Sequence, residues 1–205
     1  MSMTEALLHK RLAETPEMEP CDGVKLLYQS RFGCGHLLPP DGQLAERIQA
    51  EADELPENAA LPPFTFIGNG LCRMNLAAPA VRALPPERLA RMMTLTAEDV
   101  PPMTEDDERL PGFERELALL RKAAQEGLAP FSAAALEGYL AEYRAVGYPP
   151  ASHSPRYRTA YRPAYRVISG DFAVLLPLLS AIEDRIAQGK PALAVLDGPC
   201  GSGKT

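Results

Sequence analysis

The chain has 205 residues and a formal net charge of −6; 46% of its residues are hydrophobic and 23% are charged. These values are typical of a soluble globular protein with a core, and the negative charge argues against nonspecific adhesion to nucleic acid or membranes. The sequence has no uninterrupted apolar run of about 18 residues, so we expect no membrane span. Its first residues lack the pattern of a secretory signal.

Three helices are predicted in the first quarter of the chain. Residues 3–13 carry their apolar side chains on one side. Asp22 is placed to cap a helix over 24–32 that Gly33 ends, and Asp41 is placed to cap a third that runs to residue 55. A glycine-flanked turn between the second and third helices carries His36, a candidate acid, base or ligand contact.

Residues 64–76 predict a β-hairpin, because two short apolar runs flank Asn69-Gly70, a dipeptide that favours tight hairpin turns. Asn69, Arg73 and Asn75 are its polar residues, and the last two share a face because strand side chains alternate. Such a face is either exposed to solvent or lines a cleft together with His36 and the arginines and tyrosines of residues 153–166, so Asn69 and Arg73 are candidate substrate-binding residues.

The remaining elements follow from capping, periodicity and proline positions. In chain order they are a helix from Pro85 to residue 96, an acidic loop over 98–112, and helices over 113–126 and 133–146 (the latter capped by Ser132). Residues 148–163 lack helical apolar periodicity, and we expect one helical turn before Pro163 followed by an extended piece. A strand over 165–169 and an apolar helix over 171–188, kinked or interrupted at Pro177, follow. The predicted fold class is therefore mainly α with a small β-hairpin (α+β).

Residues 153–166 contain four arginines and three tyrosines, and the unit Tyr-Arg-x-Ala occurs twice in succession. Arginine forks bind phosphate or carboxylate, and tyrosine offers a ring and a hydroxyl. Arg158, Arg162 and Arg166 are therefore candidate residues for binding a small anionic or nucleoside-like ligand, and His153 joins His36 as a catalytic candidate. Two other interpretations stay open: tyrosines in the core with arginines paired to acidic helices, or nucleic-acid contact, which the net charge disfavours.

The four cysteines have no framework spacing. Cys34 and His36, with Cys21 or Cys72, form a weak metal-site candidate, because their spacing fits no usual zinc pattern. We expect reduced thiols and a cytoplasmic location.

Residues 198–205 match the phosphate-binding pattern G-x-x-x-x-G-K-[ST], and the apolar residues 191–197 predict a buried parallel strand that leads into it. Lys204 is predicted to reach the phosphates of ATP, and the Thr205 hydroxyl to bind Mg²⁺. The predicted cofactor-binding residues are Gly198, Gly201, Ser202, Gly203, Lys204 and Thr205.

Residues 196–205 resemble the opening of small-molecule P-loop kinases, especially uridine kinase-like and cytidylate kinase-like proteins, and the resemblance covers residues 191–205. It implies an α/β P-loop NTPase domain that uses ATP and Mg²⁺. In such kinases the acceptor site and catalytic carboxylate follow the loop. We therefore expect a chain truncated at its P-loop and inactive alone, with a helical accessory or ligand-recognition module over 1–170 and the start of the NTPase domain over 171–205.

Three functions are compatible with these patterns. The leading one is the N-terminal part of a P-loop kinase that phosphorylates a small molecule such as a nucleoside. The second is a non-enzymatic ligand-sensing or protein-docking helical module fused to a P-loop ATPase. The third is an RNA-binding ATPase component.

Overall fold

The structure is a computed structural model that describes residues 3–104 and 106–195. The chain divides into two compact units, residues 1–170 and residues 171–205. The helices of the first unit are α1 (Met3–Glu14), α2 (Pro20–Phe32), the 3₁₀ helix η1 (Gly35–Leu37), α3 (Leu44–Glu54), α4 (Pro79–Arg82), α5 (Pro86–Asp99), α6 (Leu110–Gln125), α7 (Ala133–Ala145) and α8 (Pro155–Tyr161).

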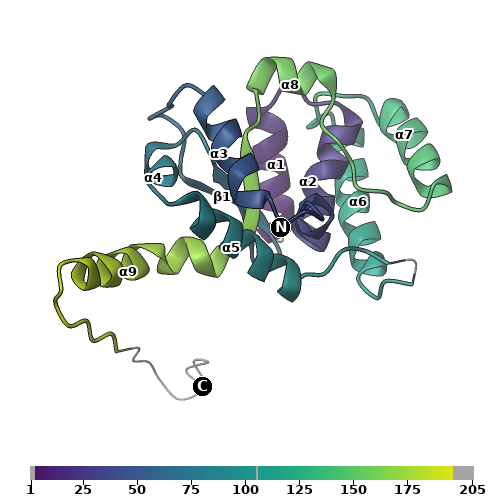
Figure 1. Ribbon diagram of the computed structural model, residues 1–205. Coiled ribbons are helices and arrows are strands. Elements are labelled where there is room, and N and C mark those ends of the chain that lie inside the picture. The colour runs from purple at the N-terminus through teal and green to yellow at the C-terminus, as the bar shows by residue number, and fades with distance from the viewer. Residues whose placement is uncertain (1–2, 105, 196–205) are drawn as a thin grey trace. The chain divides into compact units, whose positions relative to one another are not determined.

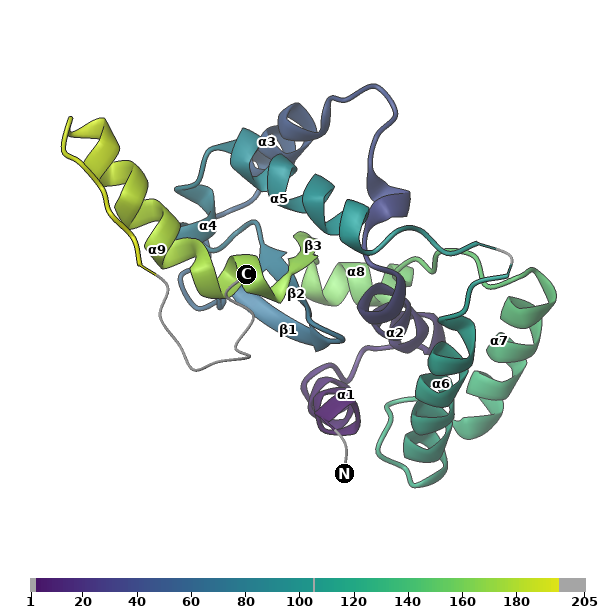
Figure 2. The same ribbon diagram turned by 90° about the horizontal axis from the view of Figure 1, so that it is seen from below.

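Three antiparallel strands form one small sheet in the order β1 (Phe64–Gly68), β2 (Leu71–Asn75), β3 (Tyr165–Ser169). The central strand β2 therefore joins the hairpin to a strand that follows it by about 90 residues in the chain. The helix α5 lies along one side of this sheet and α1 along the other (Figures 1 and 2). The first unit is thus mostly helical around an antiparallel sheet, which confirms the α+β class.

The hairpin turn forms where the sequence predicts it. Asn69 and Gly70 have φ angles of 49° and 75°. Two consecutive positive φ angles are what a two-residue hairpin turn requires, and Asn and Gly adopt them at low cost. The turn is held in place from outside the sheet, because Nδ2 of Asn69 donates to Oε1 of Glu116 on α6 over 3.0 Å.

The helix α2 begins four residues earlier than the sequence predicted. Its N-cap is Glu19, and Asp22 lies in the first turn, where its carboxylate accepts a hydrogen bond from the Glu19 backbone N–H over 3.0 Å. Asp22 therefore closes a reciprocal capping box instead of capping the helix itself. Gly33 ends the helix with a φ of 65°, as predicted.

The apolar core between α2, α6 and α7 is built on aromatic side chains. Phe32 and Phe113 are fully buried, and their rings meet at an angle of 71° with centroids 5.2 Å apart. Truncating a buried phenylalanine to alanine typically costs about 3–5 kcal/mol of stability. This core fixes α2, which carries the polar residues described below.

Several predicted elements are corrected. Residues 155–161 form the helix α8, although no helical periodicity was seen there; seven residues are too few to show one, and Ser154 caps the helix through the Tyr157 N–H over 3.0 Å. The four-residue helix α4 was also missed. The acidic loop is shorter than predicted, because α5 runs to Asp99 and α6 begins at Leu110. The helix α7 and its Ser132 cap are confirmed.

The helix α9 (Gly170–Ala187) contains Pro177 within its length and makes up most of the described residues of the second unit. Residues 191–195 form no strand, and Leu193 and Val195 are 92% and 77% exposed. The predicted buried strand is therefore wrong for these residues, because a parallel strand exists only when another strand pairs with it. No helix in the described part of the chain is long and apolar enough to cross a membrane.

Candidate functional site

The Tyr-Arg segment folds as a helix, a turn and a strand. Ser154 and Pro155 start α8, and Arg162 ends it in the left-handed conformation with φ 42° and ψ 56°. Pro163 then prevents the helix from continuing, and the chain enters β3 at Tyr165. A left-handed conformation is uncommon for a residue other than glycine and marks stored strain.

A chain of polar contacts runs from α2 to β3 beneath this segment. Nδ1 of His153 lies 2.8 Å from Oδ1 of Asp22, and Nε2 of the same ring lies 2.7 Å from the hydroxyl of Tyr165. Asp22 is buried and accepts, so Nδ1 carries a proton and Nε2 of the neutral ring accepts from Tyr165. The Tyr165 hydroxyl also lies 3.1 Å from Oε1 of Gln29, so two acceptors share one proton.

The network ends on a buried positive charge. Arg73 is only 6% exposed; its guanidinium donates to Oε1 of Gln29 over 2.9 Å and lies 4.2 Å from the centroid of the Tyr165 ring. Its Nε is buried and makes no hydrogen bond. No described carboxylate forms an ion pair with Arg73, so a carbonyl oxygen and a ring face are its nearest compensation.

Both oxygens of the Asp22 carboxylate accept hydrogen bonds. Besides His153 and the Glu19 N–H, it accepts from the N–H and the hydroxyl of Ser154 over 2.9 and 2.7 Å. Burial alone would raise the pKa of Asp22, but the hydrogen bonds from His153, Glu19 and Ser154 outweigh burial and hold that pKa below its ordinary value.

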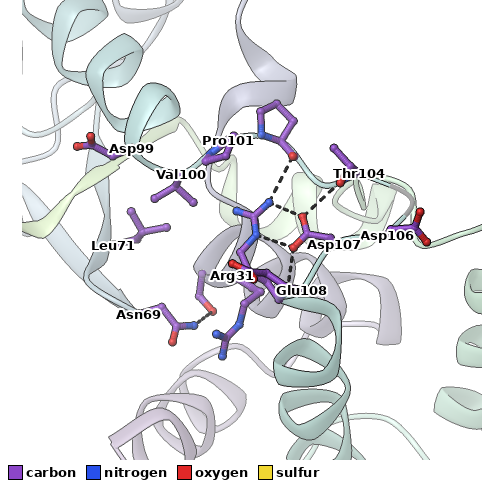
Figure 3. A pocket seen from close by; sticks show the side chains of 13 residues that line it. Arg31, Asn69, Leu71, Asp99, Val100, Pro101, Thr104, Asp106, Asp107 and Glu108 are labelled. Atoms are coloured by element: carbon purple, nitrogen blue, oxygen red, sulfur yellow. Dashed lines mark hydrogen bonds and ion pairs between the residues drawn. The ribbon is translucent and has the colours of Figure 1, made fainter.

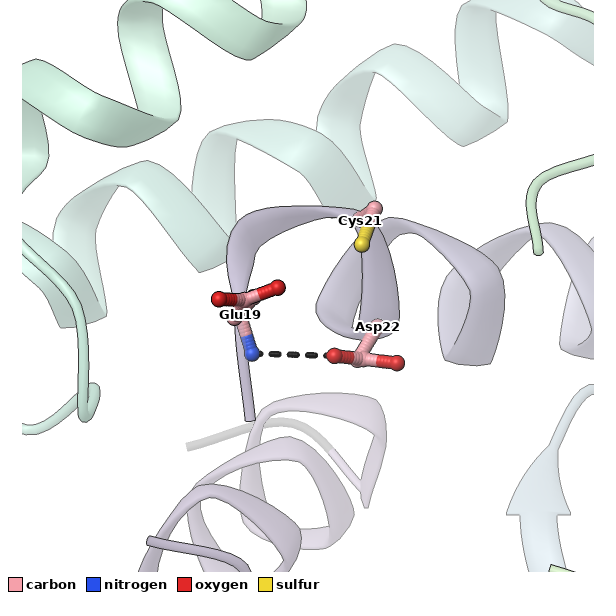
Figure 4. Close-up of side chains that lie close together, drawn as sticks. All are labelled: Glu19, Cys21 and Asp22. Carbon is pink, nitrogen blue, oxygen red and sulfur yellow. Dashed lines mark hydrogen bonds between the residues drawn. The ribbon is translucent and has the colours of Figure 1, made fainter. Parts of the chain in front are cut away.

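Glu19, Cys21 and Asp22 form the one group with metal-ligand spacing among the described His, Cys, Asp and Glu residues (Figure 4). Both Asp22 oxygens already accept hydrogen bonds, and burial raises the pKa of the Cys21 thiol to about 11. The Glu19 and Asp22 members of this group form the capping box at the start of α2, which accounts for their closeness.

The ring of His153 also packs against another aromatic ring. It stacks on Tyr157 with centroids 4.2 Å apart and an interplanar angle of 3°. Burial lowers the pKa of His153 to about 4, since it outweighs the opposing effect of the Asp22 hydrogen bond, and the positive charges of Arg73 and Lys25 act in the same direction as burial. His153 is therefore neutral at pH 7.

A pocket of about 420 Å³ opens beside this network. We call it the basic pocket, because its lining includes five basic side chains and one carboxylate: Lys25, His153, Arg158, Arg162, Arg166 and Glu51. The single acid is already paired with Arg166. Burial, followed by the nearby Arg73 and Arg158, lowers the pKa of Lys25 to about 8.

Three of the predicted ligand-binding arginines and one predicted catalytic histidine therefore meet in one place. Arg158, Arg162, Arg166 and His153 all line the basic pocket. The fourth arginine, Arg73, lines a second pocket on the other side of the Arg162–Tyr165 segment, together with Asn75. Arg73 is therefore buried and lines a cleft with part of the Tyr-Arg segment, but His36, the other expected member of that cleft, does not line it.

The other two candidates lie elsewhere. Asn69 lines a third pocket of about 640 Å³, whose charged lining is mostly acidic (Figure 3). Its two arginines are occupied, Arg31 by Glu116 and Arg109 by Asp107. Arg109 holds the pKa of Asp107 at about 2, so this pocket offers no free cation to an anionic ligand.

His36 does not join the basic network. Its ring contacts the edge of Tyr28 with centroids 5.5 Å apart, and Nδ1 is buried without a partner. Burial lowers its pKa to about 4. The neighbouring Gly35 is required for packing, because a Cβ there would lie 2.7 Å from Pro102. Cys34, the proposed metal partner, instead donates to the Met93 carbonyl over 3.6 Å.

Sequence reasoning missed half of the network. One face of α2 carries Asp22, Lys25 and Gln29 at spacings of three and four residues. Such a polar stripe on an otherwise apolar helix could have indicated these residues from the sequence. The predicted cofactor residues 198–205 lie outside the described residues, so their role stays a prediction.

No protein-family model, curated protein or solved structure matches this chain.

Proposed function

We propose that residues 3–170 form the ligand-recognition module of an ATP-dependent P-loop phosphotransferase. The module binds a small anionic, nucleoside-like ligand in the basic pocket, and the ATP-binding domain that begins near residue 171 transfers a phosphoryl group from Mg²⁺-ATP. The nucleotide half of this proposal is supported by the motif at 198–205, and the ligand half by the described residues.

One observation carries the ligand half: the basic pocket holds three cations that no carboxylate neutralises among the described residues. Lys25 donates to the carbonyl of Ala151 over 3.2 Å, Arg158 donates to the carbonyl of His153 over 3.1 Å, and the Arg162 side chain has no ion pair. Because the chain as a whole is acidic, with a net charge of −6, its composition does not explain this cluster of cations. Guanidinium and ammonium groups with spare donors are suited to phosphate or carboxylate.

The backbone at Arg162 supports the same conclusion. A left-handed arginine costs about 1–2 kcal/mol relative to glycine, which takes this conformation freely. Arg162 nevertheless adopts this conformation. Its side chain forms no ion pair with a described residue that would offset the cost. Backbone strain of this kind is concentrated at binding and active sites, so the conformation of Arg162 supports a role in ligand binding.

His153 positions this site and does not itself act as an acid or base. Both ring nitrogens are engaged, by Asp22 and by Tyr165, and both ring partners are buried or half-buried. The neutral ring fixes the start of α8, and with it Arg158, at the rim of the pocket. We therefore assign His153 a positioning role instead of the catalytic role predicted from the sequence.

A thermal-shift series on the 205-residue chain tests the ligand half, with uridine, uridine 5′-monophosphate, uridine 5′-diphosphate and inorganic phosphate as probes. At about 100 times its dissociation constant, a ligand raises the melting temperature of a domain of this size by roughly 5–10 °C. We expect a phosphorylated nucleoside to do so, and Arg158→Ala or Arg162→Ala to abolish the shift. Absence of any shift, or shifts that both variants retain, would contradict the proposal.

Arg156→Ala is the matched control. Arg156 lies on the same helix, is exposed, and pairs with Glu17 away from the basic pocket. Loss of the shift in this variant as well would indicate a general charge effect. The reading frame after Thr205 tests the nucleotide half: an Mg²⁺-binding carboxylate at the end of a further strand supports the kinase, and its absence from that reading frame opposes it.

A second candidate function is supported by α9. Val174, Leu175, Leu178 and Leu179 are exposed, at spacings that place them on neighbouring positions of one helix. In the kinase proposal these side chains pack against the ATP-binding domain; in the alternative, they dock a protein partner of a non-enzymatic sensor. A melting-temperature shift with a protein partner and none with any phosphorylated ligand would favour the alternative.

A further inference from the structure

The most unusual charge in the first unit is Arg73, at the middle of the central strand. It pairs in register with Thr65 on β1 and Val167 on β3. Its side chain projects on the side of the sheet where α1 lies, since Lys10 and Arg11 line the same pocket. A guanidinium at the centre of a sheet is costly to bury unless an anion or several acceptors compensate it.

The protein alone supplies little of that compensation. Arg73 has one carbonyl acceptor, one aromatic face and a buried Nε without any acceptor. The nearest charged neighbours on the α1 side are also positive, and burial, followed by Arg73, lowers the pKa of Arg11 below its ordinary value. Glu14 lines the same pocket, but it already pairs with Arg11 over 3.3 Å and Lys10 over 3.8 Å.

A pocket of about 420 Å³ lies against Arg73, and we call it the Arg73 pocket. Besides Glu14 and a few neutral polar residues, its lining holds cations and flat or apolar side chains. The cations are Lys10, Arg11, Arg73 and Arg162; the flat or apolar residues are Leu61, Pro62, Tyr157, Tyr161, Pro163 and Tyr165. The volume is within the range of small-molecule sites. A mixture of arginine forks and tyrosine rings suits a ligand with one anionic group and one flat ring.

We infer that the Arg73 pocket is a second binding site, separate from the basic pocket, for a small organic anion that carries a planar ring. Its phosphate or carboxylate group neutralises the cluster of Arg73 and Arg11, and its ring packs among the tyrosines and prolines. The Arg162–Tyr165 segment separates the two pockets and lines both of them. This inference goes beyond the proposed function and does not depend on it.

Isothermal titration of the 205-residue chain with simple probes tests the site. Phenyl phosphate and benzoate each combine a ring with an anion, whereas inorganic phosphate and phenol each supply only one of the two. We expect phenyl phosphate or benzoate to bind at least about tenfold more tightly than either single-feature probe, because both halves of the lining contribute. The better of the two identifies the anionic group as phosphate or carboxylate.

Variants locate the binding. Arg73→Met keeps the length of the side chain and removes the charge, and is expected to weaken binding of the better probe by at least about tenfold. Arg11→Gln, closer to the surface, gives an independent readout with a loss of at least about threefold even if Arg73→Met fails to fold. Arg158→Ala lies in the basic pocket only and is expected to leave this binding unchanged.

Undiminished binding in Arg73→Met or in Arg11→Gln would overturn the inference, and so would the absence of heat with both ring-bearing probes. If Arg158→Ala abolishes binding while Arg73→Met retains it, the probe occupies the basic pocket; the inference then fails and the proposed function stands. In the converse result, no nucleotide raises the melting temperature but the probe still binds through Arg73. The proposed function then fails and the inference about the Arg73 pocket stands.

Discussion

The hydroxyl of Tyr165 lies 2.7 Å from Nε2 of His153, and this contact joins the first residue of β3 to the residue just before the α8 cap. Through it, the carboxylate of Asp22 on α2 is connected to Arg73 on β2. The walls of both pockets are therefore positioned by one continuous set of hydrogen bonds.

Tyr165→Phe tests whether that hydroxyl matters for the fold. The variant keeps the ring beneath Arg73 but leaves Nε2 of His153 without a donor, and an unsatisfied buried polar atom costs about 1–3 kcal/mol. We expect the free energy of unfolding, measured in urea, to fall by about that amount. Tyr161→Phe is the control, since its hydroxyl accepts only the Glu17 N–H. An equal or larger loss in the control would count against the network.

Asp22→Asn preserves the shape of the side chain but replaces one acceptor oxygen by a donor. Asp22 accepts four hydrogen bonds, two on each oxygen, so the NH2 group of asparagine would leave two of the donors without their acceptor. We expect the free energy of unfolding to fall by about 3 kcal/mol, as for other breaks in buried charged networks. Asp41→Asn, on an exposed residue, is expected to change stability little. Similar effects of the two variants would contradict this account.

Stability is predicted to fall on mild acidification. The pKa of His153 is lowered from 6.5 to about 4 by burial, so between these values the unfolded chain holds a proton that the folded chain lacks. This contribution is fully present above pH 6.5 and is lost as the pH falls towards 4. His36 acts in the same direction through the same window.

Urea unfolding at a series of pH values measures that effect as protons taken up on unfolding. His153→Gln and His36→Gln should each reduce the uptake by about one proton, and the double variant by about two. An unchanged slope in His153→Gln would show that His153 is not held neutral in the folded state.

Arg162 offers a test that separates stability from binding. Glycine adopts the left-handed conformation without strain, so Arg162→Gly should match or exceed the parent in stability, with a gain of up to about 1 kcal/mol. The same variant should lose the nucleotide-induced thermal shift. A clear loss of stability on replacement by glycine would indicate that the arginine is kept for packing instead.

Much of the fold could be predicted from local signals. Ser132 marks the start of α7, Asn69-Gly70 marks the hairpin turn, and Gly33 marks the end of α2. The missed elements lack such signals or need partners. The helix α8 is too short for periodicity, and the apolar residues 191–195 have the composition of a strand but pair with no strand in the described part of the chain.

The site was predicted only where the sequence is locally unusual. The arginines of the Tyr-Arg segment stand out by repetition, and the structure places three of them around one pocket. Asp22 and Gln29, which bond to His153 and Tyr165 of the same segment, precede them by more than 120 residues, and only the packing of α2 against the sheet brings them together. His36 looked similar to His153 in the sequence, but its burial against Tyr28 separates it from the network.

The central claim is that the basic pocket binds a phosphorylated, nucleoside-like ligand. The most direct test is isothermal titration of uridine 5′-monophosphate into the parent chain and into the Arg158→Ala/Arg162→Ala double variant. Each charged hydrogen bond contributes about 1.5–3 kcal/mol, so we predict saturable binding by the parent and at least about a hundredfold weaker binding by the double variant. Equal affinity in the two proteins, or no heat from the parent, would contradict the claim.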